Sequence, residues 1–314
     1  MLKYAIKRIL LMIPVILGVS FLVYFIMDMA PGDVISVIAG DQNLTTEQLA
    51  ELRASYGLDK SVFVRYLLYM KNFLRGDLGT SYITHKPVLQ SFMEKFPATL
   101  MLTIASILVT IIISIPLGIY SALKRGTIKD NVALVLALLG QSIPSFWLGL
   151  ILIIVFSLNL HWLPSGGIGG IKNVILPALT MGTGMTAILT RTTRSSMLDV
   201  LRQDYLQTAR AKGVPEKKVI LKHALSNALI PIITIAGSHF AYCLGGSVLI
   251  ETVFAWPGVG RLIVDSLNSR DTVMVTGCII LKSTIIGFIL LLVDLLYAVI
   301  DPRIKAQFAK GYKR

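Results

Sequence analysis

The stretch FPATLMLTIASILVTIIISIPLGIYSAL, residues 96–123, decides the class of this protein. It holds 28 residues without a single Asp, Glu, Lys or Arg. Since a helix needs about 20 apolar residues to cross a bilayer core, this run predicts a membrane-spanning helix. The composition agrees, because 54% of the 314 residues are hydrophobic and only 15% are charged, whereas soluble proteins average about 25% charged residues. A water-soluble fold is therefore excluded.

Five further apolar runs lie on either side of this stretch. They predict spans over residues 9–27, 131–158, 173–190, 224–250 and 277–300. The run that begins at Asn131 stays uncharged as far as Ile171, but Pro164 and a glycine cluster from Gly166 to Gly170 end it as a helix near residue 158. The predicted fold class is all-α, a polytopic membrane protein with six transmembrane helices.

The basic residues predict how these spans are oriented. The chain carries 30 Lys and Arg against 17 Asp and Glu, a net charge of +13. Nineteen basic residues fall on the side that holds both termini and ten on the other side. Because short cytoplasmic segments are enriched in Lys and Arg, both termini are expected in the cytoplasm. The first apolar run follows three basic residues, as in a secretory signal, but it is longer than the usual 7–15 residues, so it is expected to remain as a helix.

The predicted organisation has four parts. Residues 1–30 form the first transmembrane helix, 31–97 a long external loop, 98–300 a five-helix core with a coupling loop at 197–223, and 301–314 a cytoplasmic tail.

Two short helices are expected in the external loop. Thr45 and Gln48 have the spacing of a capping box, which predicts a helix that stops near Gly57. A second helix is expected from Ser61 to Leu74. Its apolar face, which either packs on the rest of the loop or lies at the membrane surface, consists of Phe63, Leu67, Met70 and Leu74.

The sequence lacks the common signatures of an enzyme. It contains no GxxxxGK[ST], HExxH, GxSxG or Cys-x-x-Cys motif, and the glycines from Gly166 to Gly170 predict a turn. The four histidines are too far apart in sequence to predict a shared metal site; they are His85, His161, His223 and His239. Cys243 and Cys278 lie in apolar stretches and are expected to be packing residues.

Two ionisable residues lie inside the last predicted span. Because a charge inside the membrane is costly, such residues usually line a transport pathway or pair with an opposite charge. Lys282 lies near the outer end, where its long side chain can reach the interface or serve a substrate. Asp294 lies nearer the cytoplasmic end and is expected to pair with a basic residue on another helix.

The longest cytoplasmic segment, residues 191–228, contains QDYLQTARAKG at 203–213. This stretch predicts a helix that Gly213 ends in a left-handed turn, and Pro215 is expected to open a second helix. Two short helices joined by a tight turn could be gripped by another protein. Alternatively, the segment is a basic surface held by anionic lipids.

This segment resembles the cytoplasmic motif of the permease subunits of ATP-binding-cassette importers, specifically the dipeptide, oligopeptide and nickel branch. The general motif is Glu-Ala-Ala, three residues and Gly, and the matching positions are Gln207, Thr208, Ala209 and Gly213. Where the general motif has a later proline this chain has Ser226, and Pro231 comes five residues further on. Further strings of the same branch are APGD at 30–33, GDLGTS at 76–81, PATL at 97–100, FAWPGVG at 254–260, DLL at 294–296 and DPR at 301–303.

The resemblance implies a helix that couples the permease to a cytoplasmic ATPase. Gly213 is then the turn of the coupling helix, and Ala209 is small so that the helix seats closely. The implied coupling residues are Asp204, Tyr205, Gln207, Thr208, Ala209, Arg210, Ala211, Lys212 and Gly213. The implied structural marks of the family are Trp256, Pro257, Gly258, Asp294, Asp301, Pro302 and Arg303.

The resemblance also implies the surroundings of the chain. They are a second related permease, two ATPase subunits that use ATP and Mg²⁺, an external solute-binding protein and membrane lipid, with no nucleic acid. The chain itself is expected to bind no cofactor, metal or nucleotide, and to be a multi-pass protein of the cell membrane.

Short peptides are the expected cargo, and nickel or a metal chelate is the alternative within the same branch. A secondary transporter would usually show several intramembrane acids or inverted repeats, and a lipid-binding scaffold would not explain the turn at Gly213.

Overall fold

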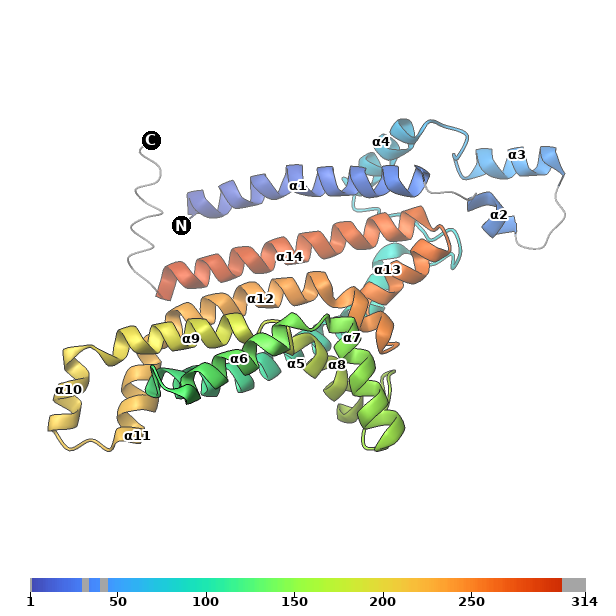
Figure 1. Ribbon diagram of the computed structural model, residues 1–314. Coiled ribbons are helices and arrows are strands. Elements are labelled where there is room, and N and C mark those ends of the chain that lie inside the picture. The colour runs from blue at the N-terminus through green and yellow to red at the C-terminus, as the bar shows by residue number, and fades with distance from the viewer. Residues whose placement is uncertain (1, 30–33, 40–44, 301–314) are drawn as a thin grey trace. The chain divides into compact units, whose positions relative to one another are not determined.

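The computed structural model describes residues 2–29, 34–39 and 45–300. Within these residues the chain forms helices and no β-strand (Figure 1). The α-helices are α1 (Leu2–Met29), α2 (Val34–Ala39), α3 (Thr46–Ser55), α4 (Val62–Phe73), α5 (Val88–Leu123), α6 (Ile128–Ser142), α7 (Ser145–Leu152), α8 (Ile171–Thr183), α9 (Thr186–Leu201), α10 (Asp204–Ala211), α11 (Glu216–Lys218), α12 (Leu225–Val253), α13 (Val259–Asn268) and α14 (Thr272–Ile300). Two π-helical segments complete the set, η1 (Ile153–Asn159) and η2 (Val219–Ala224). The expected all-α class is confirmed.

The number of spans depends on how two bent helix pairs are counted. Within the described residues, four helices are long and apolar enough to cross a membrane, and the total reaches six if each bent pair is one span. One pair joins α6 to α7 and η1 across a bend of 95°, and the other joins α8 to α9 across 61°. The sequence predicted these two spans as continuous helices, which is wrong.

The first break has a clear cause in the sequence. Ile143 precedes Pro144 and takes an extended backbone, with φ −79° and ψ 126°, because a residue before proline is disfavoured in the helical region. At the second break, α8 ends at Thr183 and α9 begins at Thr186, with Gly184 and Met185 between them. The end of the 131–158 run was predicted well, since η1 stops at Asn159.

The chain divides into two compact units, which are described separately. The first unit comprises Met1–Ala5, Leu100–Trp256 and Ile289–Arg314. In it, α9 packs along α12 and α6, and α7 packs on α8 and α12. Buried glycines let α5 approach α8 and α9 closely: a Cβ at Gly182 would lie 2.6 Å from the backbone oxygen of Ser106, and one at Gly118 would lie 2.5 Å from the Thr193 Cβ.

The second unit comprises Ile6–Thr99 and Pro257–Phe288. Its core joins α1, α4, the start of α5 and α14 through Tyr24, Tyr69, Phe92 and Met274. The hydroxyl of Tyr66 on α4 donates to the carbonyl of Leu17 at 3.0 Å. This hydrogen bond fixes α4 against α1 within the unit.

In the loop after α1, the helices α3 and α4 have the bounds that the sequence predicted, but the apolar face of α4 is packed differently from the prediction. The capping box is confirmed: Thr45 Oγ1 accepts from the Gln48 amide, and Gln48 Oε1 accepts from the Thr45 amide. The helix α4 has the expected bounds, but Phe63, Leu67 and Leu74 are 57%, 51% and 81% exposed, whereas Met70 is buried. Of the two alternatives for this face, packing is therefore wrong for the three exposed residues and holds for Met70, and the membrane-surface alternative remains a prediction.

Candidate coupling site

The residues of the predicted coupling segment form a helical hairpin, which we define as residues 204–218. The helix α10 ends at the cap Lys212, and Gly213 adopts φ +75°, a left-handed conformation that favours glycine. The Gly213 amide donates to the Arg210 carbonyl at 2.9 Å, and the Val214 amide donates to the Ala209 carbonyl at 3.2 Å. This pair of bonds is a Schellman motif, so the predicted left-handed turn at Gly213 is confirmed.

The return arm of the hairpin begins where the sequence predicted. Pro215 is the N-cap of α11, and the Val219 amide donates to the Pro215 carbonyl at 3.1 Å. The chain then passes through η2 directly into α12. The hairpin is thus continuous with a long helix of the first unit (Figure 1).

An apolar underside holds the hairpin to its own unit. Leu206 from α10 and Val219 from η2 are both 0% exposed, and they share a cluster with Met197, Ala122 and Ala228. Burial of large apolar side chains contributes about 1.5–3 kcal/mol each. The hairpin is therefore packed on the bundle, and its orientation is tied to α9 and α12.

An ion pair closes the hairpin across its turn. Arg210 donates from Nε to Glu216 Oε2 at 3.0 Å and from Nη2 to Glu216 Oε1 at 2.9 Å. These hydrogen bonds raise the pKa of Arg210, which keeps the guanidinium charged. Both side chains are exposed, so the pair adds little to stability but its two parallel bonds restrict the geometry of the turn.

A tyrosine fixes the other end of α10. The Tyr205 hydroxyl accepts a hydrogen bond from Asn227 Nδ2 at 2.9 Å and donates to the His223 carbonyl at 3.4 Å. Asn227 Nδ2 also donates to the His223 carbonyl, at 2.8 Å. These contacts tie α10 to the junction of η2 and α12.

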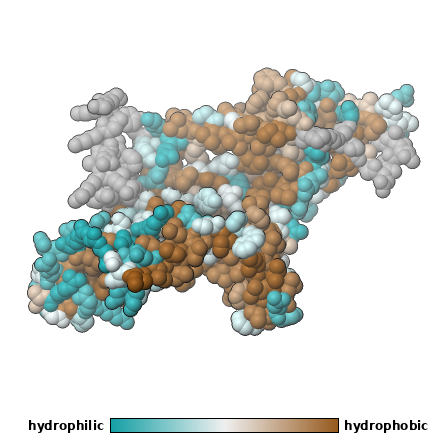
Figure 2. Space-filling model, viewed as in Figure 1, coloured by the Kyte–Doolittle hydropathy of each residue, from teal (hydrophilic) through white to brown (hydrophobic). Residues whose placement is uncertain are grey.

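The structure brings all nine predicted coupling residues together on one hairpin, but they do not all face outward. Ala209 is half-buried and packs on the underlying cluster, so its small size lets α10 approach its own bundle. The other eight are exposed; they are Asp204, Tyr205, Gln207, Thr208, Arg210, Ala211, Lys212 and Gly213. Figure 2 shows the resulting hydrophilic surface over α10 and α11, next to the hydrophobic surface of the bundle.

Sequence reasoning missed a buried ion pair in the same unit. Asp130 is 2% exposed, and its carboxylate accepts hydrogen bonds from Arg194 Nε at 2.9 Å and Nη2 at 2.7 Å. Its carboxylate also accepts from the Ser121 hydroxyl and, at 3.1 Å, from the Gly126 amide. Asp130 lies in the first turn of α6 and Arg194 on α9, so the pair joins two helices through residues that are 64 positions apart in sequence.

The predicted family marks occupy structural positions. Trp256 is 0% exposed and its amide donates to the Glu251 carbonyl at 2.8 Å. Gly258 is the N-cap of α13, and Pro257 precedes it half-buried. Asp294 accepts a hydrogen bond from the Tyr4 hydroxyl at 2.8 Å; the expected basic partner stays a prediction. Two of the quoted strings, 30–33 and 301–303 with Asp301, Pro302 and Arg303, lie outside the described residues.

The two cysteines and the glycine cluster at 166–170 agree with the sequence predictions. Both cysteines are free and buried, as expected for packing residues. The turn predicted at Gly166 to Gly170 is confirmed, and the Gly167 amide donates to the Phe254 carbonyl at 2.9 Å. Among the described residues, no three His, Cys, Asp or Glu side chains are grouped so that they could hold a metal ion.

These features define the class of the protein: a polytopic α-helical membrane protein with broken helices and a helical hairpin packed on the end of its bundle. Residues 114–306 match the family model described as "Binding-protein-dependent transport system inner membrane component", and residues 1–103 match the N-terminal model of the same systems. The chain belongs to this family. It is a permease subunit of ATP-binding-cassette importers and a multi-pass bacterial inner-membrane protein, with ATP hydrolysis assigned to partner ATPases.

Two relatives show how close the similarity is. The glutathione transport system permease protein GsiC of Escherichia coli O6:H1 is 44% identical over 306 residues, which cover 97% of this chain and 99% of that protein. The dipeptide transport system permease protein DppB of Escherichia coli strain K12 is 38% identical over 336 aligned residues, with the same coverage.

A solved structure shares the fold. The inward-facing methionine ABC transporter MetNI gives a TM-score of 0.57 at 17% identity, covering 68% of this chain and 97% of that chain. At this level of identity the likeness concerns the fold alone.

Proposed function

We propose that the chain forms one half of the translocation pathway of a short-peptide importer, and that the 204–218 hairpin transmits the ATPase cycle to it. The single observation that carries this proposal is the hairpin itself. Its inner side is anchored by Leu206 and Val219, its turn is closed at Gly213, and its outer side is polar. A helix that is anchored in this way can move as a rigid body when another protein binds its outer side and displaces it.

The proposed partners are a second related permease, two cytoplasmic ATPase subunits and an external solute-binding protein. The ATPases would use ATP and Mg²⁺, and this chain would bind neither. Both termini and the hairpin are assigned to the cytoplasm, because nineteen basic residues accumulate on that side. Anionic lipid at the basic surface is compatible with this arrangement.

Short peptides are the proposed cargo. The named relatives are permeases of glutathione and dipeptide systems, and glutathione is itself a tripeptide derivative. Nickel or a metal chelate is the alternative cargo.

The test places a β-branched residue at the hairpin turn. In the reconstituted importer with its binding protein, Gly213→Val should abolish ATP-driven uptake of alanyl-alanine while the chain still inserts and assembles. A Cβ at Gly213 meets no atom within 4 Å, so the effect arises from the left-handed backbone, where a bulky residue costs on the order of 1–3 kcal/mol.

The external loop supplies a matched control. Gly57 follows α3 with φ +65°, and a Cβ there also meets no atom within 4 Å. Its turn has the same two hydrogen bonds, from the Gly57 amide to the Ala54 carbonyl and from the Leu58 amide to the Arg53 carbonyl. Gly57→Val should therefore carry the same local strain and keep most of the uptake. Equal uptake by the two variants would refute the coupling role.

A further inference from the structure

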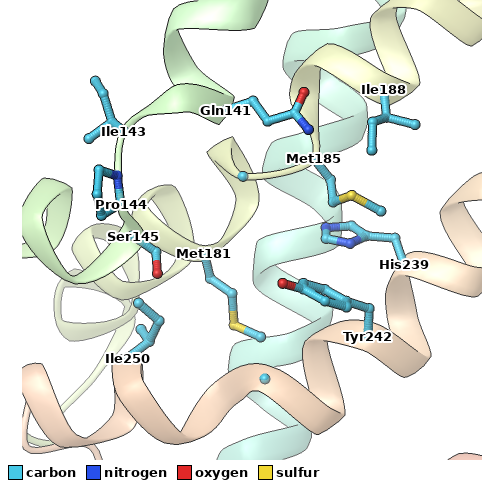
Figure 3. A pocket seen from close by; sticks show the side chains of 12 residues that line it. Gln141, Ile143, Pro144, Ser145, Met181, Met185, Ile188, His239, Tyr242 and Ile250 are labelled. Carbon is cyan, nitrogen blue, oxygen red and sulfur yellow. The ribbon is translucent and has the colours of Figure 1, made fainter.

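A cavity lies inside the first unit where its two broken helix pairs meet α12. Its volume is about 570 Å³, within the ~300–1,000 Å³ range of ordinary small-molecule sites. Its wall includes Ile143 to Ser145 at the first break and Gly184 with Met185 at the second. Figure 3 shows His239 and Tyr242 reaching into it from α12, opposite Pro144 and Ser145 at the first break.

The lining combines apolar surface with a few uncharged polar groups. The polar side chains are those of Gln141, Ser145, His239 and Tyr242, and methionine and isoleucine side chains supply much of the rest. Among the described residues that line the cavity, none is Asp, Glu, Lys or Arg. Such a surface gives no electrostatic preference for a ligand of either sign.

The first helix break adds backbone polar groups to this lining. The first N–H groups of α7 and the last C=O groups of α6 have no backbone partner within their own helix. In a membrane such groups need a partner, and they are tolerated where they border a cavity. A peptide main chain offers both donors and acceptors and is complementary to them.

The cavity is not closed by this chain alone. His239 is 2% exposed, whereas Tyr242, one turn further along α12, is 67% exposed. The cavity is therefore open beside Tyr242. If the chain works in the proposed importer, the second permease would cover this side.

We propose that this cavity is a binding subsite for the main chain of a short peptide in transit, formed jointly with the second permease and indifferent to the charge of the cargo side chains. The proposal rests on the proposed function. It assigns the recognition to the uncharged polar groups Gln141, Ser145, His239 and Tyr242 and to the backbone at the first break.

The first experiment fills the cavity. A Cβ at Gly246, which lines the cavity, would lie 3.9 Å from the nearest atom, Tyr242 Cε1, so a larger side chain has room to enter. In proteoliposomes with the intact importer, Gly246→Phe should reduce the uptake of tetra-alanine at least tenfold more than that of alanyl-alanine. Gly18→Phe is the matched control, because Gly18 lies on α1 with no atom within 4 Å of its Cβ, and it should leave the ratio unchanged.

The second experiment gives the cavity a charge. Gln141→Glu should shift the ratio of lysyl-lysine to glutamyl-glutamate uptake about tenfold toward the basic peptide, and Gln141→Lys should shift it by a similar factor the other way. Each ratio is divided by that of the unsubstituted importer, which cancels the selectivity of the binding protein. Opposite shifts in the two variants are the signature of a charge that faces the cargo.

The outcomes separate this proposal from the proposed function. Unchanged size and charge ratios in all three cavity variants would overturn the subsite, and would indicate a lipid chain in the cavity. Loss of all uptake in Gly246→Phe, equal for both peptides, would also overturn the subsite, because a partly filled main-chain site should impair the longer peptide more. Normal uptake by Gly213→Val would instead overturn the coupling role, whatever the cavity variants do.

Discussion

The buried pair between Asp130 and Arg194 offers the sharpest test of what holds the first unit together. Replacing Arg194 by methionine keeps much of the side-chain volume and removes both charged hydrogen bonds. Asp130 then keeps only its bonds from Ser121 and Gly126. A carboxylate that is 2% exposed is left without its countercharge.

The size of the effect follows from the burial of the two partners. Breaking a buried ion pair by removing one partner costs about 3–5 kcal/mol. The Arg194 side chain keeps 25% of its surface exposed, against 3% for Asp130, so we expect the lower end, about 3 kcal/mol. Replacing both residues with apolar ones, as in Asp130→Leu with Arg194→Met, removes the orphaned charge and should cost at most about 1 kcal/mol.

The assay is a double-mutant cycle on the free energy of unfolding. The purified chain is unfolded in mixed micelles by increasing the fraction of sodium dodecyl sulfate, with the two single variants, the double variant and the parent compared. We expect a coupling energy of about 2–3 kcal/mol, the upper part of the range for residues in direct contact. Additive single effects, or an Arg194→Met variant within about 0.5 kcal/mol of the parent, would refute this reasoning.

Two further predictions concern the hairpin and a close backbone contact. Arg210→Glu should change the unfolding free energy by at most about 1 kcal/mol, since the pair is exposed, yet it should lower coupled ATP hydrolysis. Adding Glu216→Arg, which swaps the two charges, should restore coupled ATP hydrolysis. Failure of the double variant to restore hydrolysis would exclude the pair from coupling. Gly166→Ala should destabilise the chain in a thermal melt, because its Cβ would lie 2.1 Å from the Phe254 carbonyl oxygen. Gly184→Ala, with its nearest atom at 3.7 Å, should melt like the parent, and equal melting of the two alanine variants would contradict the clash.

Local signals in the sequence were sufficient for the short helices and their ends. The capping box at Thr45, the turn at Gly213 and the helix start after Pro215 each depend on residues within six positions of one another. Such interactions are specified by backbone conformation and hydrogen bonding along the chain, which explains why a single sequence reveals them.

The breaks in the helices were harder to predict. An apolar run shows that a segment can cross the membrane, but it does not show whether its helix is straight. Pro144 was a visible signal, because proline disfavours the helical conformation of the residue before it. The break at Gly184 and Met185 has only a weak signal, since glycine is frequent in straight transmembrane helices.

Contacts between residues far apart in the sequence could not be predicted, for a different reason. Arg194 was counted among the basic residues that orient the chain, Asp130 carried no prediction, and nothing in their spacing indicates that α6 and α9 bring them together. The mixed outcome for α4 has a similar origin: helical periodicity gathers Phe63, Leu67 and Met70 on one side, and the structure buries Met70 together with Tyr66 and Tyr69, whose hydroxyl groups make them less obvious core residues.

The hairpin and the cavity are joined by the same two helices. The helix α9 begins beside Met185 at the cavity and leads to α10, and α12 leaves the hairpin through η2 and carries His239 to the cavity wall. From Ala224 to His239 is about 22 Å of helical rise, and α9 packs along α12. A helix transmits a displacement along its axis with little loss, whereas its broken ends absorb rotation. On the proposed function, movement of the hairpin would therefore tilt two walls of the cavity together, while the breaks at Pro144 and Gly184 would let the remaining walls stay in place.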